Sequence, residues 1–303
     1  MRVPDVVLGE RTGDPPDRRR ARRRTSVLPA AGVLLLALVV LVATVGPYLY
    51  AVDARAMKGR RFQPPGATFV LGTDYLGRDV LAGVVRGART SLAVGAAATL
   101  IVLVVGVVVG GVAGYYGGRV DNALMRVTEF FQVLPAFLCA MVLVAIFSPT
   151  LTTIVIAIGI TNWAGMARLV RAEFLALRAR EFVTAARAVG ASDWRLMTRA
   201  VLPSSLPPIV VNTALTVGVC ILFEAGLSFL GLGDANTISW GYMIGSSRTY
   251  LREAWWAVTF PGVAIFLTVL SLSLVGDALN QLLDPTARQR GRNAHTQKGE
   301  QRR

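Results

Sequence analysis

The sequence is poor in the side chains that most often build catalytic and metal sites. Its only histidine, His295, lies in the polar C-terminal tail, so neither a His-based metal site nor a Ser-His-Asp triad can be assembled. Lys58 and Lys298 are the only lysines, and each is followed by Gly, whereas a phosphate-binding P-loop needs Lys-Ser or Lys-Thr. Cys139 and Cys220 lie far apart in apolar segments and are expected to be small buried residues rather than a disulfide. We therefore expect no enzyme activity, no metal and no cofactor.

The chain is rich in apolar residues, and its charges are unevenly placed. Of its 303 residues 53% are hydrophobic, and the mean hydropathy is +0.53. The net charge of +14 does not indicate nucleic-acid binding, because basic residues cluster in both tails and in one internal segment while long stretches carry none. This pattern is typical of a multi-pass membrane protein.

Hydropathy predicts an all-α integral membrane protein with about six transmembrane helices. A bilayer crossing needs roughly 20 apolar residues. The expected spans are residues 27–50, 91–115, 127–147, 151–167, 206–227 and 257–275. The first run is too long for a typical signal-peptide core of about 7–15 residues, so we favour a retained span over a cleaved signal. The remaining parts are a basic tail (1–26), a loop (51–90), a core (91–284) with a loop at 168–205, and a second tail (285–303).

Lys and Arg counts predict the orientation. With the N-terminus inside, 23 basic residues fall on the inner side and 9 on the outer side. This excess predicts that both termini and the loop 168–205 are cytoplasmic, in a cell (inner or plasma) membrane. Residues 51–90 are an exception, because this outer loop alone holds seven of the basic residues. Within this loop, the glycines and the two acids of residues 71–79, Asp74 and Asp79, favour a compact hydrogen-bonded turn, with cation binding as a weaker alternative.

Residues 172–208 form the only long amphipathic, charged segment between strongly apolar ones. We expect a helix from Ala172 to Val189 that stops at Gly190, and a second short helix capped by Ser192. Pro203 and the pair at 207–208 are expected to end that second helix. Three functions remain open: a positive-inside loop, a helix-turn-helix motif that reads nucleic acid, and a docking element for a soluble partner. The membrane spans on both sides of the segment argue against the nucleic-acid-binding function, because they leave no room for a globular DNA-binding domain.

The same segment resembles the "EAA loop" of ATP-binding cassette (ABC) import permeases. The match rests on Thr184-Ala185-Ala186, Gly190 and Leu202-Pro203, although Thr184 and Ala200 stand where that family usually has Glu and often has Ile. In that family the loop forms a coupling helix that docks on the ATPase subunit. The resemblance implies these coupling residues: Thr184, Ala185, Ala186, Gly190, Ala191, Asp193, Leu202 and Pro203.

Further stretches resemble the dipeptide/oligopeptide/nickel permease family, specifically its C-type subunit. They are residues 68–91, 110–121, 227–241 and 276–285, together with the helix–turn–helix segment through Leu202-Pro203 that was described above. The resemblance implies a homologous B-type permease, two ABC ATPases and an extracytoplasmic solute-binding protein as partners, with no role for nucleic acid. Peptides are the leading substrate and nickel a weaker one. Two other classes of function remain as alternatives: a transporter driven by an ion gradient, and a membrane scaffold.

Two smaller patterns complete the expectations. Gly106, Gly110, Gly114 and Gly118 recur every fourth residue, which predicts one face for close helix packing, with pore lining as the weaker alternative. A translocation path is expected beside three polar or irregular features in the spans, namely Pro135, Asn212 and Glu224. For Glu224, an end-of-span position bonded to the backbone is an equal alternative.

Overall fold

The described chain is a bundle of helices. The computed structural model describes residues 18–283, with side chains from residue 30 onward; the predictions for 1–17 and 284–303 lie outside this range. The long helices are α1 (Arg18–Thr44), α3 (Val80–Tyr116), α6 (Leu151–Arg178), α9 (Leu202–Leu227) and α11 (Trp256–Leu283). The short ones are α2 (Gly46–Leu49), α4 (Gly118–Val133), α5 (Ala136–Phe147), α7 (Glu181–Ala188), α8 (Asp193–Leu196) and α10 (Trp240–Ser247). The predicted all-α membrane fold is confirmed.

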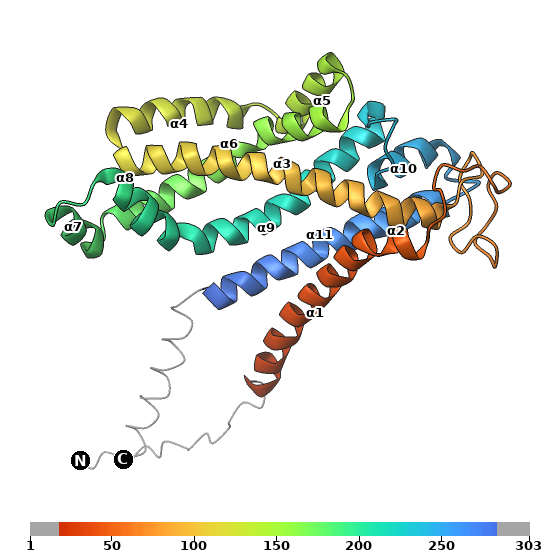
Figure 1. Ribbon diagram of the computed structural model, residues 1–303, viewed down its shortest axis with the longest axis horizontal. Coiled ribbons are helices and arrows are strands. Elements are labelled where there is room, and N and C mark those ends of the chain that lie inside the picture. Colours follow the sequence, from red (N-terminus) through yellow and green to blue (C-terminus); the bar gives the residue numbers. More distant parts are fainter. Residues whose placement is uncertain (1–17, 284–303) are drawn as a thin grey trace, which may run out of the picture.

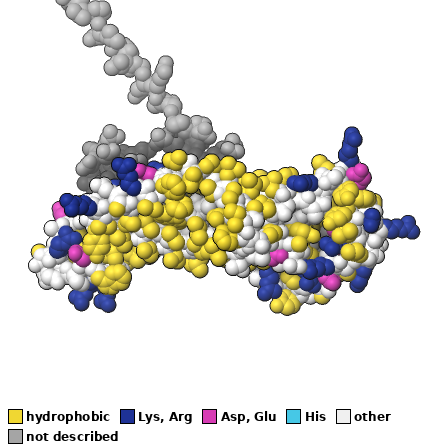
Figure 2. Space-filling view, turned by 90° about the horizontal axis from the view of Figure 1, so that it is seen from above, with side chains coloured by type: hydrophobic (Ala, Val, Ile, Leu, Met, Phe, Trp, Pro, Cys, Tyr) yellow, Lys and Arg dark blue, Asp and Glu magenta, His cyan; other side chains and the backbone are white. Residues whose placement is uncertain are grey.

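The two ends of the bundle differ in structure (Figure 1). Residues 51–79 and α10 lie together at one end, here called the loop end, and α7 and α8 lie at the other, here called the hairpin end. Helices α3, α6 and α9 run between the ends, and α1 packs beside α11. Figure 2 shows an apolar middle with charged side chains gathered towards both ends, as expected for a bundle that crosses a bilayer.

The number of helices that could span a membrane depends on how a bent pair is counted. Four helical stretches are long and apolar enough to cross a membrane, and a fifth is formed if α4 and α5 count as one bent span. The apolar part of the first helix, Ala30–Thr44, is shorter than this length. The prediction of six spans is therefore not confirmed in the described residues.

Several helices extend beyond the predicted spans. Helix α3 begins at Val80, so the loop predicted for 51–90 ends eleven residues early. The reason is a cap: the carboxylate of Asp79 accepts hydrogen bonds from the N–H groups of Leu81 and Ala82. Helix α6 continues to Arg178, and α1 begins at Arg18, inside the stretch predicted as a tail. Hydropathy marks the apolar part of a helix and not its polar ends.

The predicted third span is broken rather than bent. Helices α4 and α5 meet at an angle of 83°, as either a broken span or a re-entrant loop. Leu134 has an extended backbone (ψ 133°) and Pro135 follows it as the N-cap of α5. A proline disfavours helical geometry in the residue before it, which ends α4 at this point.

The prolines after the hairpin do not end a helix. Helix α8, a π-helical turn (Met197–Val201) and α9 are continuous, so one helical stretch runs from Asp193 to Leu232 through Pro203 and on past Pro207 and Pro208. Buried helices tolerate proline when local π turns and hydroxyl side chains adjust the hydrogen bonds nearby. Here the hydroxyl of Ser204 donates to the carbonyl of Ala200 at 2.7 Å. The prediction of a proline stop is wrong.

Candidate functional site

The hairpin end contains a break that the sequence did not indicate. Helix α6 stops at Arg178, and α7 begins at Glu181, where an uninterrupted helix from Ala172 to Val189 was predicted. The guanidinium of Arg178 donates to the carbonyl of Tyr115 at 2.8 Å, at the C-terminal end of α3. Folding back also buries Val183 of α7. These tertiary contacts override the helix propensity of the segment.

The turn after α7 forms as predicted, except for its cap. Gly190 has φ +89°, the left-handed geometry that favours glycine, and nothing lies within 4 Å of where a side chain would begin. Ser192 precedes α8, but its hydroxyl makes no capping hydrogen bond.

A tyrosine of α3 binds the hairpin to the bundle. The hydroxyl of Tyr115 donates to Oδ1 of Asp193 at 2.8 Å, and Arg187 donates to the same hydroxyl at 3.2 Å. Arg187 also lies 3.5 Å from Oδ1 of Asp193, as an exposed ion pair. The three residues border an open cavity of about 620 Å³. This contact could not be predicted from the sequence, because Tyr115 is simply a tyrosine at the end of a span and Asp193 lies 78 residues further along the chain.

The expected coupling residues divide into two groups. Ala186, Ala191 and Leu202 pack against the buried cluster that holds Val183 and Leu196. Four others are exposed, namely Thr184, Ala185, Gly190 and Pro203, and the side chain of Asp193 is about half-exposed. Three exposed apolar residues of this end were not predicted from the sequence: Val189 is 89% exposed, Trp194 68% and Phe182 47%. The hairpin end therefore presents apolar side chains to its surroundings.

The glycine face of α3 lies against α6 for three of its four members. A Cβ at Gly106 would lie 2.5 Å from the side chain of Met166, and one at Gly114 would lie 2.6 Å from the carbonyl oxygen of Arg171. A Cβ at Gly110 would overlap the carbonyl oxygen of Ala167. Small residues thus let the two backbones approach closely.

Gly118 does not belong to this face. It lies beyond the end of α3, begins α4 with φ +56°, and has nothing within 4 Å of a built Cβ. Glycine therefore recurs every fourth residue in the sequence beyond Tyr116, where α3 ends, although only the glycines within α3 share one helix face.

An ion pair joins α4 to α6 near the hairpin end. Arg171 binds Asp121 with both arms of its guanidinium: Nε lies 2.5 Å from Oδ1 and Nη2 lies 2.7 Å from Oδ2. Such bidentate pairs fix orientation as well as distance. Neither residue was assigned a role from the sequence.

The three features expected beside a translocation path are not brought together. Pro135 is exposed at the break between α4 and α5. Asn212 is half-buried, and its amide nitrogen lies 3.6 Å from the sulfur of Met166 in α6. Glu224 is 1% exposed, so it does not lie on a surface that a second subunit could share.

Glu224 instead joins three segments inside the subunit. Its Oε1 accepts hydrogen bonds from the hydroxyls of Ser228 at 2.8 Å and Ser239 at 2.6 Å. Ser239 in turn caps α10 by accepting from the N–H of Tyr242. The carboxyl group therefore connects α9 to the start of α10. Glu224 thus bonds to side-chain hydroxyls, whereas the alternative considered from the sequence was a hydrogen bond to the backbone near the end of a span.

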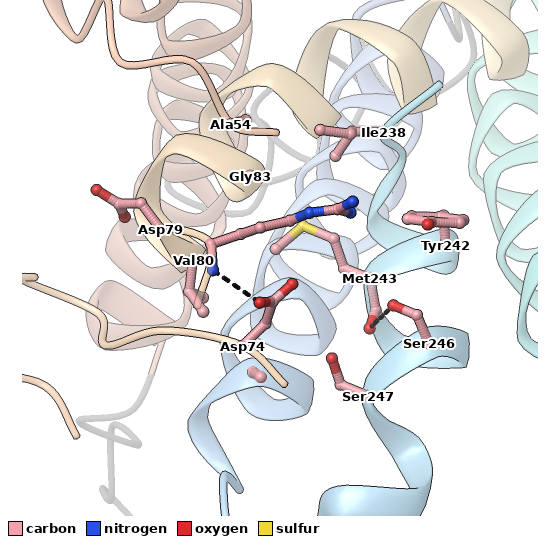
Figure 3. A pocket seen from close by; sticks show the side chains of 12 residues that line it. Ala54, Asp74, Asp79, Val80, Gly83, Ile238, Tyr242, Met243, Ser246 and Ser247 are labelled. Carbon is pink, nitrogen blue, oxygen red and sulfur yellow. Dashed lines mark hydrogen bonds between the residues drawn. The ribbon is translucent and has the colours of Figure 1, made fainter. Parts of the chain in front are cut away.

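The acids of the loop end organise turns. Oδ1 of Asp74, which is labelled in Figure 3, accepts hydrogen bonds from the N–H groups of Leu76 and Arg78, both at 2.8 Å. Burial raises the pKa of Asp74, against the lowering effect of these hydrogen bonds and of the Arg78 charge. Asp79 caps α3 and accepts a hydrogen bond from the hydroxyl of Tyr50 at 2.6 Å. The described residues contain no group of three His, Cys, Asp or Glu side chains that could hold a metal.

Comparisons with known proteins agree with the sequence resemblance. The profile of the family described as "Binding-protein-dependent transport system inner membrane component" matches residues 106–289. The dipeptide transport system permease protein DppC of Bacillus subtilis is 40% identical over 271 residues, covering 88% of this chain and 84% of that protein. The nickel transport system permease protein NikC of Escherichia coli is 39% identical over 255 residues, covering 84% and 92%. A solved structure of the MetNI methionine ABC transporter in an inward-facing conformation aligns with a TM-score of 0.54 at 19% identity, over 66% of this chain and 96% of that chain, and supports the fold.

Proposed function

Because this chain belongs to the binding-protein-dependent transport inner membrane components, and among them to the dipeptide, oligopeptide and nickel permeases, we propose that it forms half of the translocation path of an ATP-driven peptide importer. A homologous B-type permease forms the other half. Two ABC ATPases bind the hairpin end, which faces the cytoplasm together with both termini, and a solute-binding protein delivers di- or oligopeptides at the loop end.

The observation that carries this proposal is the continuous helical stretch from Asp193 to Leu232. A displacement of α8 by the ATPases moves α9 directly, because no loop separates the two. Leu202 and Pro203 lie within this helical stretch, at the start of α9, and not in a loop between two helices. Such rigid-body movement of helices is the usual basis of alternating access.

The surface that receives the ATPase lies at the tip of the hairpin end. Phe182, Val189 and Trp194 are exposed there, in or directly beside α7 and α8. Exposed apolar side chains at an aqueous end indicate a protein interface. Trp194 belongs to α8, so the docking surface and the helical stretch that continues into α9 move as one unit.

Nickel is the second candidate substrate. The nickel permease of E. coli is nearly as similar to this chain as the dipeptide permease of B. subtilis. Solute uptake by cells that lack this chain, and by cells in which it is restored, separates the candidates. Restored uptake of a labelled dipeptide supports the peptide proposal, whereas restored uptake of nickel alone replaces it.

Co-purification tests the assembly. The tagged chain is extracted in mild detergent, and the proteins that accompany it are identified by mass spectrometry. We expect one homologous permease and one or two P-loop ATPases. A chain that purifies alone, from membranes in which a candidate ATPase is present, contradicts the importer assignment and favours an independent transporter.

A tryptophan pair tests which end receives the ATPase. Trp194→Ala removes an exposed aromatic residue from the hairpin end, and Trp255→Ala removes one, 52% exposed, from the loop end. We expect Trp194→Ala to weaken ATPase retention about 30-fold or more, because central aromatic anchors contribute roughly 2 kcal/mol or more to binding. Trp255→Ala should retain the ATPase. Equal retention by both variants would place the docking surface elsewhere.

A further inference from the structure

The seven basic residues between 51 and 90 are an unexplained feature of the loop end. Three of them, Arg55, Arg86 and Arg89, come from two separate segments and line one cavity of about 280 Å³. Asp53 is the only acid that lines it. The cavity therefore carries an excess of two positive charges, and it lies outside the machinery proposed for ATPase coupling.

These charges are not neutralised within the described chain. Arg86 and Arg89 are exposed, and neither forms an ion pair or a side-chain hydrogen bond with another described residue. They lie three residues apart on α3, a spacing at which side chains are neighbours and like charges repel. Arg55 donates to the carbonyl oxygen of Asn236, which holds the third guanidinium against the segment before α10. An anion in the cavity would offset this repulsion.

The position of the cavity along the bundle identifies the anion. Residues 90–116 of α3 are uncharged and span roughly 40 Å, compared with a hydrocarbon layer of about 30 Å. Arg86 and Arg89 are thus the last charges before the apolar part of this helix. Pro47, which follows the apolar helix Ala30–Thr44, also lines the cavity. Two helices therefore place the cavity at the level of the lipid headgroups.

We propose that this cavity binds the phosphate of an anionic phospholipid headgroup at the loop end. Arg86 and Arg89 present planar guanidinium groups that can donate two parallel hydrogen bonds each to a phosphate. The hydroxyls of Thr90 and Thr237 line the same cavity and supply further donors. The bound lipid holds the loop end at the bilayer. Its negative phosphate neutralises part of the positive charge of these basic residues, which the positive-inside rule would not place on the outer side.

Lipid retention by the full-length protein tests this site. The protein is purified in detergent with equal amounts of phosphatidylglycerol and phosphatidylcholine, and native mass spectrometry measures the lipid that remains bound. The test variant is Arg86→Gln with Arg89→Gln. The matched control is Arg60→Gln with Arg61→Gln, which removes two exposed charges from the same loop but outside the cavity.

We expect the wild type and the control to retain phosphatidylglycerol in preference to phosphatidylcholine. The test variant should bind phosphatidylglycerol about 30-fold more weakly, which corresponds to about 1 kcal/mol for each basic side chain near a lipid surface. Size-exclusion profiles and thermal unfolding of all three proteins confirm that the comparison is made between folded chains.

Three results would overturn the proposal. Equal losses in the test and control variants would mean that loop charge in general, and not this cavity, attracts the lipid. Displacement of phosphatidylglycerol by millimolar inorganic phosphate would make the cavity a site for free anions. Unchanged lipid retention, combined with loss of binding to an acidic solute-binding protein, would make it a protein contact instead. Each of these results leaves the importer assignment untouched.

Discussion

The two ends of the bundle are constructed in opposite ways. At the loop end, the hydroxyl of Thr73, which is 0% exposed, donates to the carbonyl of Arg60 at 2.6 Å and accepts from the N–H of Gln63 at 2.9 Å. The indole of Trp256 donates to the carbonyl of Thr73 at 3.0 Å. At the hairpin end, α7 buries only Val183. The loop end is thus joined by hydrogen bonds around a fully buried threonine, whereas at the hairpin end the partners of Tyr115 are the exposed side chains of Arg187 and Asp193.

This difference indicates which end can move. Segments with few buried contacts and exposed hydrogen bonds open at low free-energy cost, and moving elements are drawn from them. The loop end acts as a fixed base for α3 and α11, whereas the hairpin end meets α3 through the hydrogen bonds of one tyrosine and two arginines and through the apolar cluster that holds Tyr115, Val183 and Leu196. The following predictions test this contrast with matched residues at the two ends.

The largest contrast is expected between two glycines in left-handed geometry. Gly77 has φ +77° and a Cβ there would overlap the carbonyl oxygen of Gly59, while Gly190 has φ +89° and open space. Gly190→Ala should cost roughly 1–2 kcal/mol of unfolding free energy, from backbone strain alone. Gly77→Ala should cost roughly 2–5 kcal/mol, because overpacking adds to the same strain. Thermal unfolding in detergent measures both, and equal losses would refute the proposed difference in packing.

A threonine pair tests the buried hydrogen bonds. Thr73→Val should cost roughly 2 kcal/mol, because it leaves buried backbone groups of Arg60 and Gln63 without a partner. Thr184→Val, at an exposed site of α7, should change the unfolding free energy by less than about 0.5 kcal/mol. Denaturant titration of both variants measures the difference. A large effect at Thr184 would mean that the hairpin end is more tightly held than its exposure indicates.

A tyrosine pair compares two hydrogen bonds to aspartate. Tyr50 donates to the buried Asp79, and Tyr115 donates to the half-exposed Asp193. Tyr50→Phe should cost roughly 1–2 kcal/mol, whereas water replaces much of the bond lost in Tyr115→Phe, which should cost about 0.5 kcal/mol. Hydrogen exchange should nevertheless accelerate at residues 181–196 in Tyr115→Phe, and ATP hydrolysis should lose part of its coupling to uptake. Unchanged exchange in these residues would contradict the role of Tyr115 as the attachment of the hairpin end.

The sequence predicts the parts of this fold that depend on local composition. Apolar runs located the membrane helices, and the spacing of Gly106, Gly110 and Gly114 indicated a close-packed face that lies against α6. Gly190 marked the turn after α7 because glycine alone adopts its geometry without strain. The family itself could be recognised from short motifs, and the comparisons confirm it.

The errors arise where distant contacts decide the structure. Arg178 bonds to α3 and ends α6 inside a stretch of strong helix formers. Pro207 and Pro208 continue a helix because a buried bundle and a π turn accommodate them, which rules drawn from soluble helices do not anticipate. Glu224 was expected beside a path, but its Oε1 accepts from Ser228 and Ser239 while its buried Oε2 has no hydrogen-bond partner among the described residues, and no local signal identifies hydroxyl partners on a following segment.

The smallest effect concerns the charge of Asp74 at the loop end. Burial raises its folded-state pKa above the ordinary value of 3.8, so the folded protein holds this proton more tightly than the unfolded chain. The resulting stabilisation is fully present below the unfolded pKa and is lost as the pH rises through the raised folded pKa. Asp74→Asn keeps an oxygen that accepts from Leu76 and Arg78 but has no charge to desolvate. The stability of the wild type relative to this variant should therefore fall as the pH rises above about 4, as measured by thermal unfolding at a series of pH values. The effect is small because the hydrogen bonds and the Arg78 charge offset part of the burial cost, and a difference that rises with pH would show that they exceed it.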